Sequence, residues 1–133
     1  MTTDFGKTPG RVIAVGGVFF KSTDTDRLNS WYAENLGMTR GAEGFGFRWR
    51  AHDRPEIQHF TAWAVFAQQS TYFDPSGAPF MINYIVDDLD AILAKLAASG
   101  VNIDPKREDY DYGRFAWIYD PDGNKIELWE PRG

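Results

Sequence analysis

The sequence contains no cysteine among its 133 residues. This absence excludes disulfide bonds, a catalytic thiolate and metal sites built on thiolates. It also fits a reducing compartment, and we expect a cytoplasmic protein. The first ten residues hold no apolar segment of the kind found in a signal peptide, so we expect none.

Long apolar runs and clustered positive charge are also missing. No apolar run approaches the roughly 20 residues that cross a membrane, so a membrane is not an expected partner. Lys and Arg number 14 against 19 Asp and Glu, which gives a net charge of −5. Because the basic residues are dispersed and form no stripe, we do not expect nucleic acid as a partner.

The length corresponds to one ordinary domain, and we predict a single domain over residues 1–133. Hydrophobic residues make up 43% of the chain, which is enough for a core, and aromatic residues make up 16%. So many aromatic side chains indicate that some of them line a concave surface as well as pack. The composition therefore favours a protein that takes a small-molecule ligand.

The first half of the chain reads as a strand followed by a capped helix. The apolar run at 12–20 predicts the strand, and the apolar spacing predicts a helix over 25–36. Asp24 or Thr25 is suited to cap the start of this helix, and Gly37 to end it.

The second half repeats this plan. Residues 80–86 are rich in β-branched and aromatic side chains and predict a strand. Asp87 and Asp88 then predict the start of a helix near 88–99, and Gly100 its end. The two halves share this pattern and little sequence identity.

Shorter strands follow each helix. Alternation predicts strands at 45–50 and 59–66 in the first half, and a hairpin of 113–119 with 124–130 in the second. Each half is therefore a β-α-β-β-β module, the first about 12–66 and the second about 80–130, joined by a turn-rich linker at 67–79. One module cannot bury both faces of its sheet. We predict an α+β fold whose modules form a curved, cleft-enclosing mixed sheet with the helices outside.

The last predicted strand raises the question of what Glu127 does. Ile126 and Leu128 share one face of this strand and should meet the core. Glu127 then points to the other face, between Lys125 and Trp129. A carboxylate on a face that lines a cavity needs a partner or a function.

Three groups of residues carry a resemblance to a known family: Asp24, Trp31-Tyr32 and Leu36-Gly37; Val86-Asp87-Asp88-Leu89-Asp90; and the turn Asp120-Pro121-Asp122-Gly123-Asn124 followed by Glu127-Leu128. With these residues the chain resembles the vicinal oxygen chelate superfamily over about residues 12–130. This superfamily includes glyoxalase I, fosfomycin resistance proteins, bleomycin-binding proteins and extradiol dioxygenases. The resemblance implies paired β-α-β-β-β modules around an open cleft, often completed in a dimer, so we expect a homodimer.

The resemblance also places a metal-ligand position at Glu127. Two further ligands, usually histidine, come in this family from the first strand of each half, where this chain has Gly17 and Met81. Neither is a plausible ligand for zinc, iron or magnesium. His59 together with Glu127 would supply two ligands, one short of the usual three, and His52 reads as a loop residue. We therefore expect no metal and no cofactor.

Strand parity and the resemblance give a set of candidate site residues. Glu127 is the candidate catalytic residue, and the candidate substrate-binding residues are Phe19, Lys21, His59, Trp63, Met81, Asn83, Trp117 and Trp129. The hairpin strand offers either Phe115, Trp117 and Tyr119 or Arg114, Ala116 and Ile118, and parity does not decide between these two sets.

Several of these residues have an alternative, structural interpretation. Glu127 could form an ion pair with Lys21 or Arg114, and Asn83 could serve as a structural hydrogen-bonding residue. Without a metal ion, we expect Lys21, Asn83 or a hairpin tyrosine to hold the carboxylate. Residues 110–114 read as a lid or as a solvated loop.

Two functions are compatible with the sequence. The first is a glyoxalase-like enzyme, a lyase or isomerase acting on a small oxygenated molecule with Glu127 as its base. The second is a non-catalytic protein of the bleomycin-resistance type that binds and sequesters an aromatic or cationic compound. An extradiol dioxygenase would need iron ligands at positions 17 and 81, so we disfavour it. The sequence does not identify the ligand.

Overall fold

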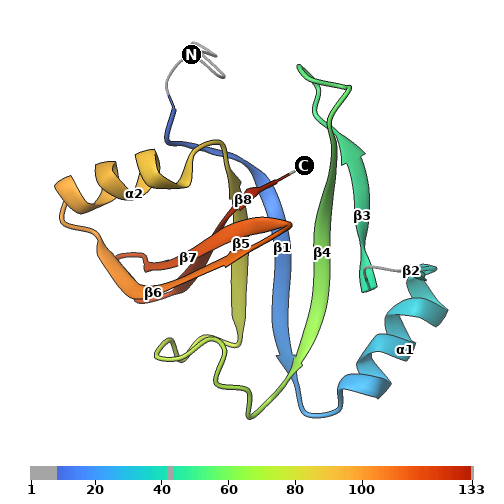
Figure 1. Ribbon diagram of the computed structural model, residues 1–133. Coiled ribbons are helices and arrows are strands. Elements are labelled where there is room, and N and C mark those ends of the chain that lie inside the picture. The colour runs from blue at the N-terminus through green and yellow to red at the C-terminus, as the bar shows by residue number, and fades with distance from the viewer. Residues whose placement is uncertain (1–8, 42–43, 133) are drawn as a thin grey trace. The chain divides into compact units, whose positions relative to one another are not determined.

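The structure is a computed structural model that describes residues 9–41 and 44–132. Its elements in chain order are β1 (Val12–Ser22), α1 (Thr25–Leu36), β2 (Arg40–Gly41), β3 (Gly44–Arg50), β4 (Gln58–Ala67), β5 (Phe80–Val86), α2 (Leu89–Ala98), β6 (Asn102–Tyr110), β7 (Gly113–Tyr119) and β8 (Lys125–Pro131) (Figure 1). Each half therefore has the order β-α-β-β-β. Parallel and antiparallel strand pairs both occur, so the predicted mixed α+β fold is confirmed.

The described residues form two compact units. The N-terminal unit is Gly16–Ile82, and the C-terminal unit combines the described residues up to Val15 with those from Asn83 onward. Strands β1 and β5 each contribute residues to both units.

In the C-terminal unit the strands lie in the order β5-β8-β7-β6, and β7 pairs antiparallel with both β8 and β6. Helix α2 covers one face of these strands (Figure 1). The core between helix and sheet is made of Val86, Leu89, Ile92, Leu93, Ala116, Ile118 and Leu128. Because side chains alternate along each strand, Glu127 must point to the face away from α2.

Local contacts fix both ends of the helix α2. The carboxylate of Asp88 accepts a hydrogen bond from the backbone N–H of Ala91, so Asp88 is the N-cap. The neighbouring Asp87 accepts from the backbone N–H groups of Gly10 and Arg11 at 2.9 and 3.0 Å. These bonds attach the start of β1 to the start of α2. A Cβ on Gly10 would lie 3.0 Å from the backbone nitrogen of Ile92, so this close approach needs glycine.

In the N-terminal unit the strands lie in the order β2-β3-β4-β1, with β1 parallel to β4 and β3 antiparallel to it. Helix α1 starts at the cap Asp24 and ends at Gly37, which takes a φ of 68°. Trp63 on β4 anchors this helix, because its ring lies 4.6 Å from that of Tyr32, centroid to centroid. Phe20 and Phe45 complete the aromatic cluster on this face.

Two aromatic residues of the segment 68–79, which the sequence predicts only as a linker, pack against the other face of the N-terminal unit. Phe73 in this segment is fully buried, and its ring lies 5.2 Å from that of Phe66. The ammonium group of Lys21 lies 5.3 Å from the centre of the Phe73 ring. Tyr72 stacks on Phe66 at 5.5 Å. The segment therefore contributes to the packing of this unit.

Strand β6 is a strand that the sequence analysis misses. Its nine residues include Pro105 and a run of charged side chains, which hide the strand pattern, and its pairing with β7 shifts register between Ile103 and Arg107. Residues 110–114 form the tight end of the β6–β7 hairpin and not a lid.

Candidate functional site

Glu127 lies on the sheet face of the C-terminal unit opposite α2, as the strand alternation predicts. Leu128 is buried in the core beneath α2 and Ile126 packs against that core. Glu127 itself is only 3% exposed. An ionised carboxylate at such depth needs hydrogen-bond donors around it.

Two neutral side chains donate to this carboxylate. Nδ2 of Asn83 on β5 donates to Oε1 at 2.6 Å, and Nε1 of Trp117 on β7 donates to Oε2 at 3.0 Å. Asn83 is 2% exposed and Trp117 1% exposed. The three residues therefore form a buried polar row across three adjacent strands, which we call the Glu127 row. The expected partner Asn83 is confirmed, while the hairpin donor is a tryptophan and not a tyrosine.

The strand register decides which face of β7 accompanies Glu127. Residues 115, 117 and 119 of β7 pair with residues 129, 127 and 125 of β8, so Phe115, Trp117 and Tyr119 share the face of Glu127. Arg114 is on the other face and pairs with Asp90 at 3.0 Å. The alternative ion pair between Glu127 and Arg114 is therefore wrong.

Toward one end of β7 and β8, aromatic rings lie on the same face as Glu127. Trp129 stacks on Phe115 with ring centres 5.8 Å apart and planes 5° apart. A Cβ on Gly113 would lie 2.3 Å from Nε1 of Trp129, so the indole can lie over this position only because residue 113 is glycine. Tyr110 and Tyr112 stack on each other at 5.1 Å beside Phe115.

Charged and phenolic groups lie at the other end. The ammonium groups of Lys106 and Lys125 lie 5.4 and 5.8 Å from the centre of the Trp117 ring. The hydroxyl of Tyr119 donates to Asp104 at 2.5 Å. Burial and this hydrogen bond raise the pKa of Tyr119 to about 12, and the same bond lowers the pKa of Asp104. Asp104 therefore stays ionised and Tyr119 neutral at physiological pH.

The candidate residues of the N-terminal unit do not all share a face. Gly17 pairs with Ala62 in the parallel β1–β4 register, so Phe19 and Lys21 share a face with Ala64 and Phe66. His59 and Trp63 lie on the opposite face, the one that carries α1. His59 and Trp63 therefore do not share a face with Phe19 and Lys21, because the parallel register pairs odd-numbered residues of β1 with even-numbered residues of β4.

The environment of His59 agrees with a packing role. Its ring stacks on Trp49 at 4.6 Å, and partial burial lowers the pKa of the imidazole. Met81, by contrast, is fully buried on β5. It shares one face of that strand with Asn83 and Ile85, which are buried as well.

The residues at the family's metal positions do not fit a divalent ion. Gly17 has no side chain, and Met81 offers only a buried thioether. Both oxygens of Glu127 already accept hydrogen bonds from the N–H groups of Asn83 and Trp117. Within residues 9–41 and 44–132, no three His, Cys, Asp or Glu side chains gather in a way that could hold a metal ion.

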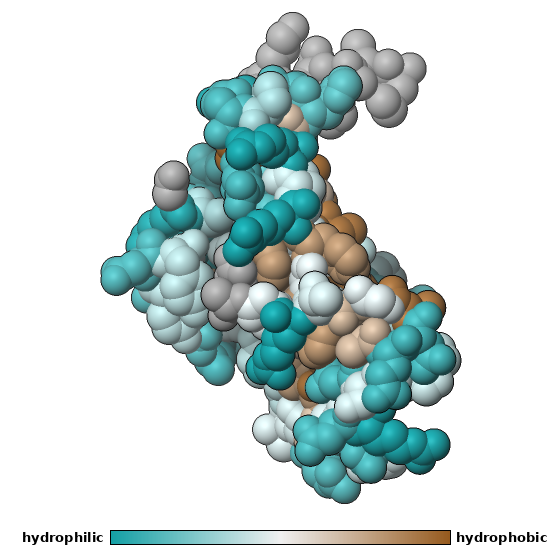
Figure 2. Space-filling view, turned by 90° about the vertical axis from the view of Figure 1, so that its right-hand side faces the viewer, coloured by the Kyte–Doolittle hydropathy of each residue, from teal (hydrophilic) through white to brown (hydrophobic). Residues whose placement is uncertain are grey.

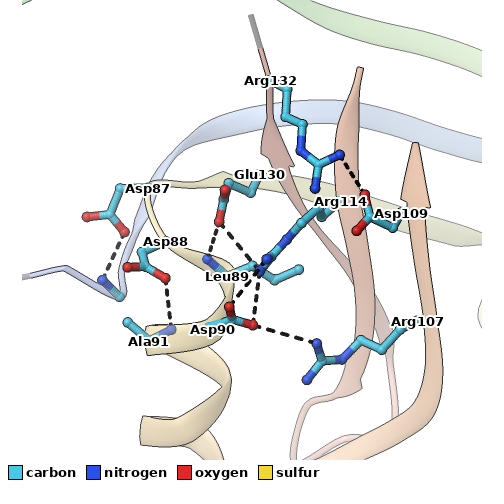
Figure 3. A network of polar contacts seen from close by, with 11 residues as sticks. Asp87, Asp88, Leu89, Asp90, Ala91, Arg107, Asp109, Arg114, Glu130 and Arg132 are labelled. Carbon is cyan, nitrogen blue, oxygen red and sulfur yellow. Dashed lines mark hydrogen bonds and ion pairs between the residues drawn. The ribbon is translucent and has the colours of Figure 1, made fainter. Parts of the chain in front are cut away.

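A second polar cluster surrounds the N-terminus of α2 (Figure 3). Arg114 binds Asp90, Glu130 accepts from the backbone N–H of Leu89 at 2.7 Å, and Arg132 pairs with Asp109 at 2.6 Å. Asp90 is 71% exposed in its side chain, and such surface pairs contribute about 0–1 kcal/mol each. This cluster ties α2 to the sheet, whereas the Glu127 row is the stronger candidate for a functional site.

A hollow lies elsewhere, in the N-terminal unit. It has a volume of about 310 Å³ and lies between α1 and strands β3 and β4. Arg40, Phe45, Trp63 and Asn29 are among its lining residues. Sequence reasoning places Trp63 in a binding site but does not foresee this location.

Comparison with known proteins identifies the family. Residues 15–128 match the sequence model of the Glyoxalase/Bleomycin resistance protein/Dioxygenase superfamily. The chain therefore belongs to this superfamily, and the predicted resemblance is confirmed. A search of curated proteins gives no match. No helix among the described residues is long and apolar enough to span a membrane.

Solved structures share the fold at low sequence identity. Methylmalonyl-CoA epimerase from Mycobacterium tuberculosis is 21% identical, with a TM-score of 0.64 over 100% of this chain and 94% of that one. A Streptomyces coelicolor methylmalonyl-CoA epimerase variant in complex with 2-nitronate-propionyl-CoA is 13% identical, with a TM-score of 0.65 over 92% and 100%. A superfamily member from Vibrio splendidus 12B01 is 15% identical, with a TM-score of 0.53 over 92% and 100%. These likenesses show the fold.

Replacing Glu127 with glutamine should destabilise the protein although the shape is kept. The glutamine amide has one oxygen, so one of the two buried donors, Asn83 or Trp117, would face an NH₂ group. We expect Glu127→Gln to lower the free energy of unfolding by about 1–3 kcal/mol. Urea unfolding measures this loss, with Glu34→Gln on the exposed side of α1 as the matched control. Equal stability of the two variants would contradict the hydrogen bonding described for Glu127.

Proposed function

We propose that this protein is a small-molecule enzyme of the isomerase or lyase type that uses Glu127 as a general base without a divalent metal ion. The observation that carries the proposal is the burial of this carboxylate together with its two oriented hydrogen bonds. Proton transfer is the chemistry that a positioned carboxylate supplies.

The hydrogen bonds to Glu127 are compatible with a base. Each carboxylate oxygen carries two lone pairs, so an oxygen that accepts one hydrogen bond can still take a proton. Because Asn83 and Trp117 come from the strands on either side of β8, they hold the carboxylate in one orientation. Such fixed orientation is what general base catalysis needs.

The structural neighbours support this reaction class. Several of them are epimerases, which are isomerases that invert one stereocentre. The residues at positions 17 and 81 separate this chain from the metal enzymes of its superfamily. We therefore propose proton transfer on a small oxygenated molecule by the carboxylate alone, with Asn83, Trp117 and Trp129 as substrate-binding residues. The roles of Phe19, Lys21 and Met81 stay predictions.

A second candidate function is binding without turnover. The hollow beside Trp63 favours it, because aromatic walls suit the sequestration of a planar compound. This function would use the N-terminal unit and would not need Glu127.

Deuterium exchange separates the two candidates. Small hydroxy and keto acids, each as single enantiomers, are incubated in D₂O with protein dialysed against EDTA, and loss of the C–H signal is followed by proton NMR. We expect exchange at one carbon of one compound, slowed about 100-fold or more in Glu127→Gln and unchanged in Glu34→Gln. The variant is assayed well below its unfolding temperature.

Three results would argue against the enzyme proposal. A compound that shifts the tryptophan fluorescence but never exchanges would support sequestration. Exchange that requires added zinc, nickel or manganese would overturn the metal-independent mechanism. Unchanged exchange in Glu127→Gln would remove Glu127 from the reaction.

We also propose that the protein is a homodimer. In the C-terminal unit, Ile13 and Val15 share one face of β1 and are 42% and 43% exposed. The face seen in Figure 2 shows apolar side chains gathered together with polar ones around them. Exposed apolar patches of this kind are typical of interfaces.

Light scattering at micromolar concentration tests the assembly. We expect twice the chain mass of 15.1 kDa, and we expect Ile13→Glu to shift the mass toward that of one chain. A stable mass of 15.1 kDa for the unmodified protein would contradict the dimer.

A further inference from the structure

The hollow of the N-terminal unit opens where strand β3 leaves strand β4. Strand β3 pairs with β4 from Gly46 to Arg50, whereas Gly44 and Phe45 pair with β2. Beyond Ala62, the described pairs of β4 are with β1 alone. A Cβ added to Gly44, which lines the hollow, would meet no atom beyond its chain neighbours within 4 Å. The departure of β3 from β4 therefore leaves open space beside α1.

The size of this hollow suits a small ligand. Its volume of about 310 Å³ is at the lower end of the range of about 300–1,000 Å³ that is usual for ligand pockets. All its lining residues belong to the N-terminal unit. The space therefore fits a molecule with a single ring and short substituents.

Asn29 on α1 brings an amide to the hollow. Its Oδ1 is buried and accepts no hydrogen bond from any residue in 9–41 or 44–132. A buried acceptor without a donor lowers stability, so such atoms are rare in folded proteins. Asparagine is also a weaker helix former than alanine or leucine. Neither packing nor helix formation therefore explains an amide at this position, whereas a ligand that donates to Oδ1 does.

The charge at the hollow comes from Arg40. Among the described lining residues it is the one charged side chain, and none of them is acidic. Its guanidinium group lies 5.9 Å from the centre of the Phe45 ring. A guanidinium group binds a carboxylate through two parallel N–H···O bonds. The charge of the lining residues therefore favours an anionic ligand.

Two aromatic rings supply the apolar part of the lining. Phe45 and Trp63 both line the hollow, with ring centres 5.7 Å apart and planes 77° apart. Aromatic pairs commonly meet edge to face in this way, and a ligand ring can add to such a cluster. The apolar part of the ligand is therefore best matched by an aromatic ring.

We propose that this hollow binds a single-ring aromatic carboxylate that also carries a hydroxyl group. Arg40 binds the carboxylate, Oδ1 of Asn29 accepts a hydrogen bond from the hydroxyl, and Phe45 and Trp63 contact the ring. This inference rests on the second candidate function, binding at the hollow, and names its ligand class. It does not involve Glu127.

Four probes separate the hydroxyl from the charge. 3-Hydroxybenzoate and 4-hydroxybenzoate have both groups, benzoate lacks the hydroxyl, and phenol lacks the carboxylate. Binding is followed on the ¹⁵N-labelled protein through the side-chain N–H signals of Asn29, Arg40 and Trp63. We expect one hydroxybenzoate to bind at least about tenfold more tightly than benzoate and phenol and to shift all three signals.

Variants test whether Asn29 and Arg40 carry these preferences. Asn29→Ala should fold, because alanine is the strongest helix former, and it should bind the hydroxybenzoate within about twofold of benzoate. Arg40→Gln should bind the hydroxybenzoate within about twofold of phenol. The matched controls Asn35→Ala and Arg27→Gln change exposed residues of α1 that do not line the hollow, and should keep the full preference.

Each contrary result overturns the proposed ligand class. Equal binding of benzoate would mean that a buried water, and not a ligand hydroxyl, satisfies Asn29. Equal binding of phenol would mean that Arg40 holds no carboxylate. If another planar compound shifts the three signals and the hydroxybenzoates do not, sequestration at the hollow stands and only the ligand class is lost. If no compound shifts them, the second candidate function fails as well.

Discussion

The C-terminal unit depends on the buried carboxylate of Glu127. This carboxylate accepts hydrogen bonds from Asn83 and Trp117. A negative charge that is 3% exposed is tolerated only where donors surround it. The two donors come from the strands on either side of β8, so the same bonds that satisfy the charge also fix the side chains of three strands. Removing Asn83 or Trp117 would take one of these hydrogen bonds away from a buried carboxylate.

Because side chains alternate along each strand, one face of this sheet forms the core and the other carries the Glu127 row. Leu128 and Ala116 face α2 and form the core, while Glu127 and Trp117 face away from it. The ion pairs near Asp90 and Glu130 hold α2 at the edge of the core face (Figure 3). The polar row therefore lies on a rigid support, which a functional carboxylate requires.

Much of this arrangement follows from local patterns in the sequence. The helix α1, its cap Asp24 and the inward and outward positions of β8 were predictable, because caps and strand alternation depend on neighbouring residues. The strand β6 was not, because its proline and charges mask it. The sheet face on which Trp63 and His59 lie was not predictable either. It depends on the register between β1 and β4, which are far apart in sequence. The bonds from Gly10 and Arg11 to Asp87 are equally non-local.

The central claim is that neutral N–H donors, and not a metal ion, occupy the oxygens of Glu127. Paramagnetic Mn²⁺ tests it directly, because a bound ion broadens the NMR signals of nearby protons. The account predicts that the indole N–H of Trp117 and the amide N–H₂ of Asn83 stay sharp when Mn²⁺ is added to the ¹⁵N-labelled protein in excess. Selective loss of these two signals at stoichiometric Mn²⁺ would contradict it.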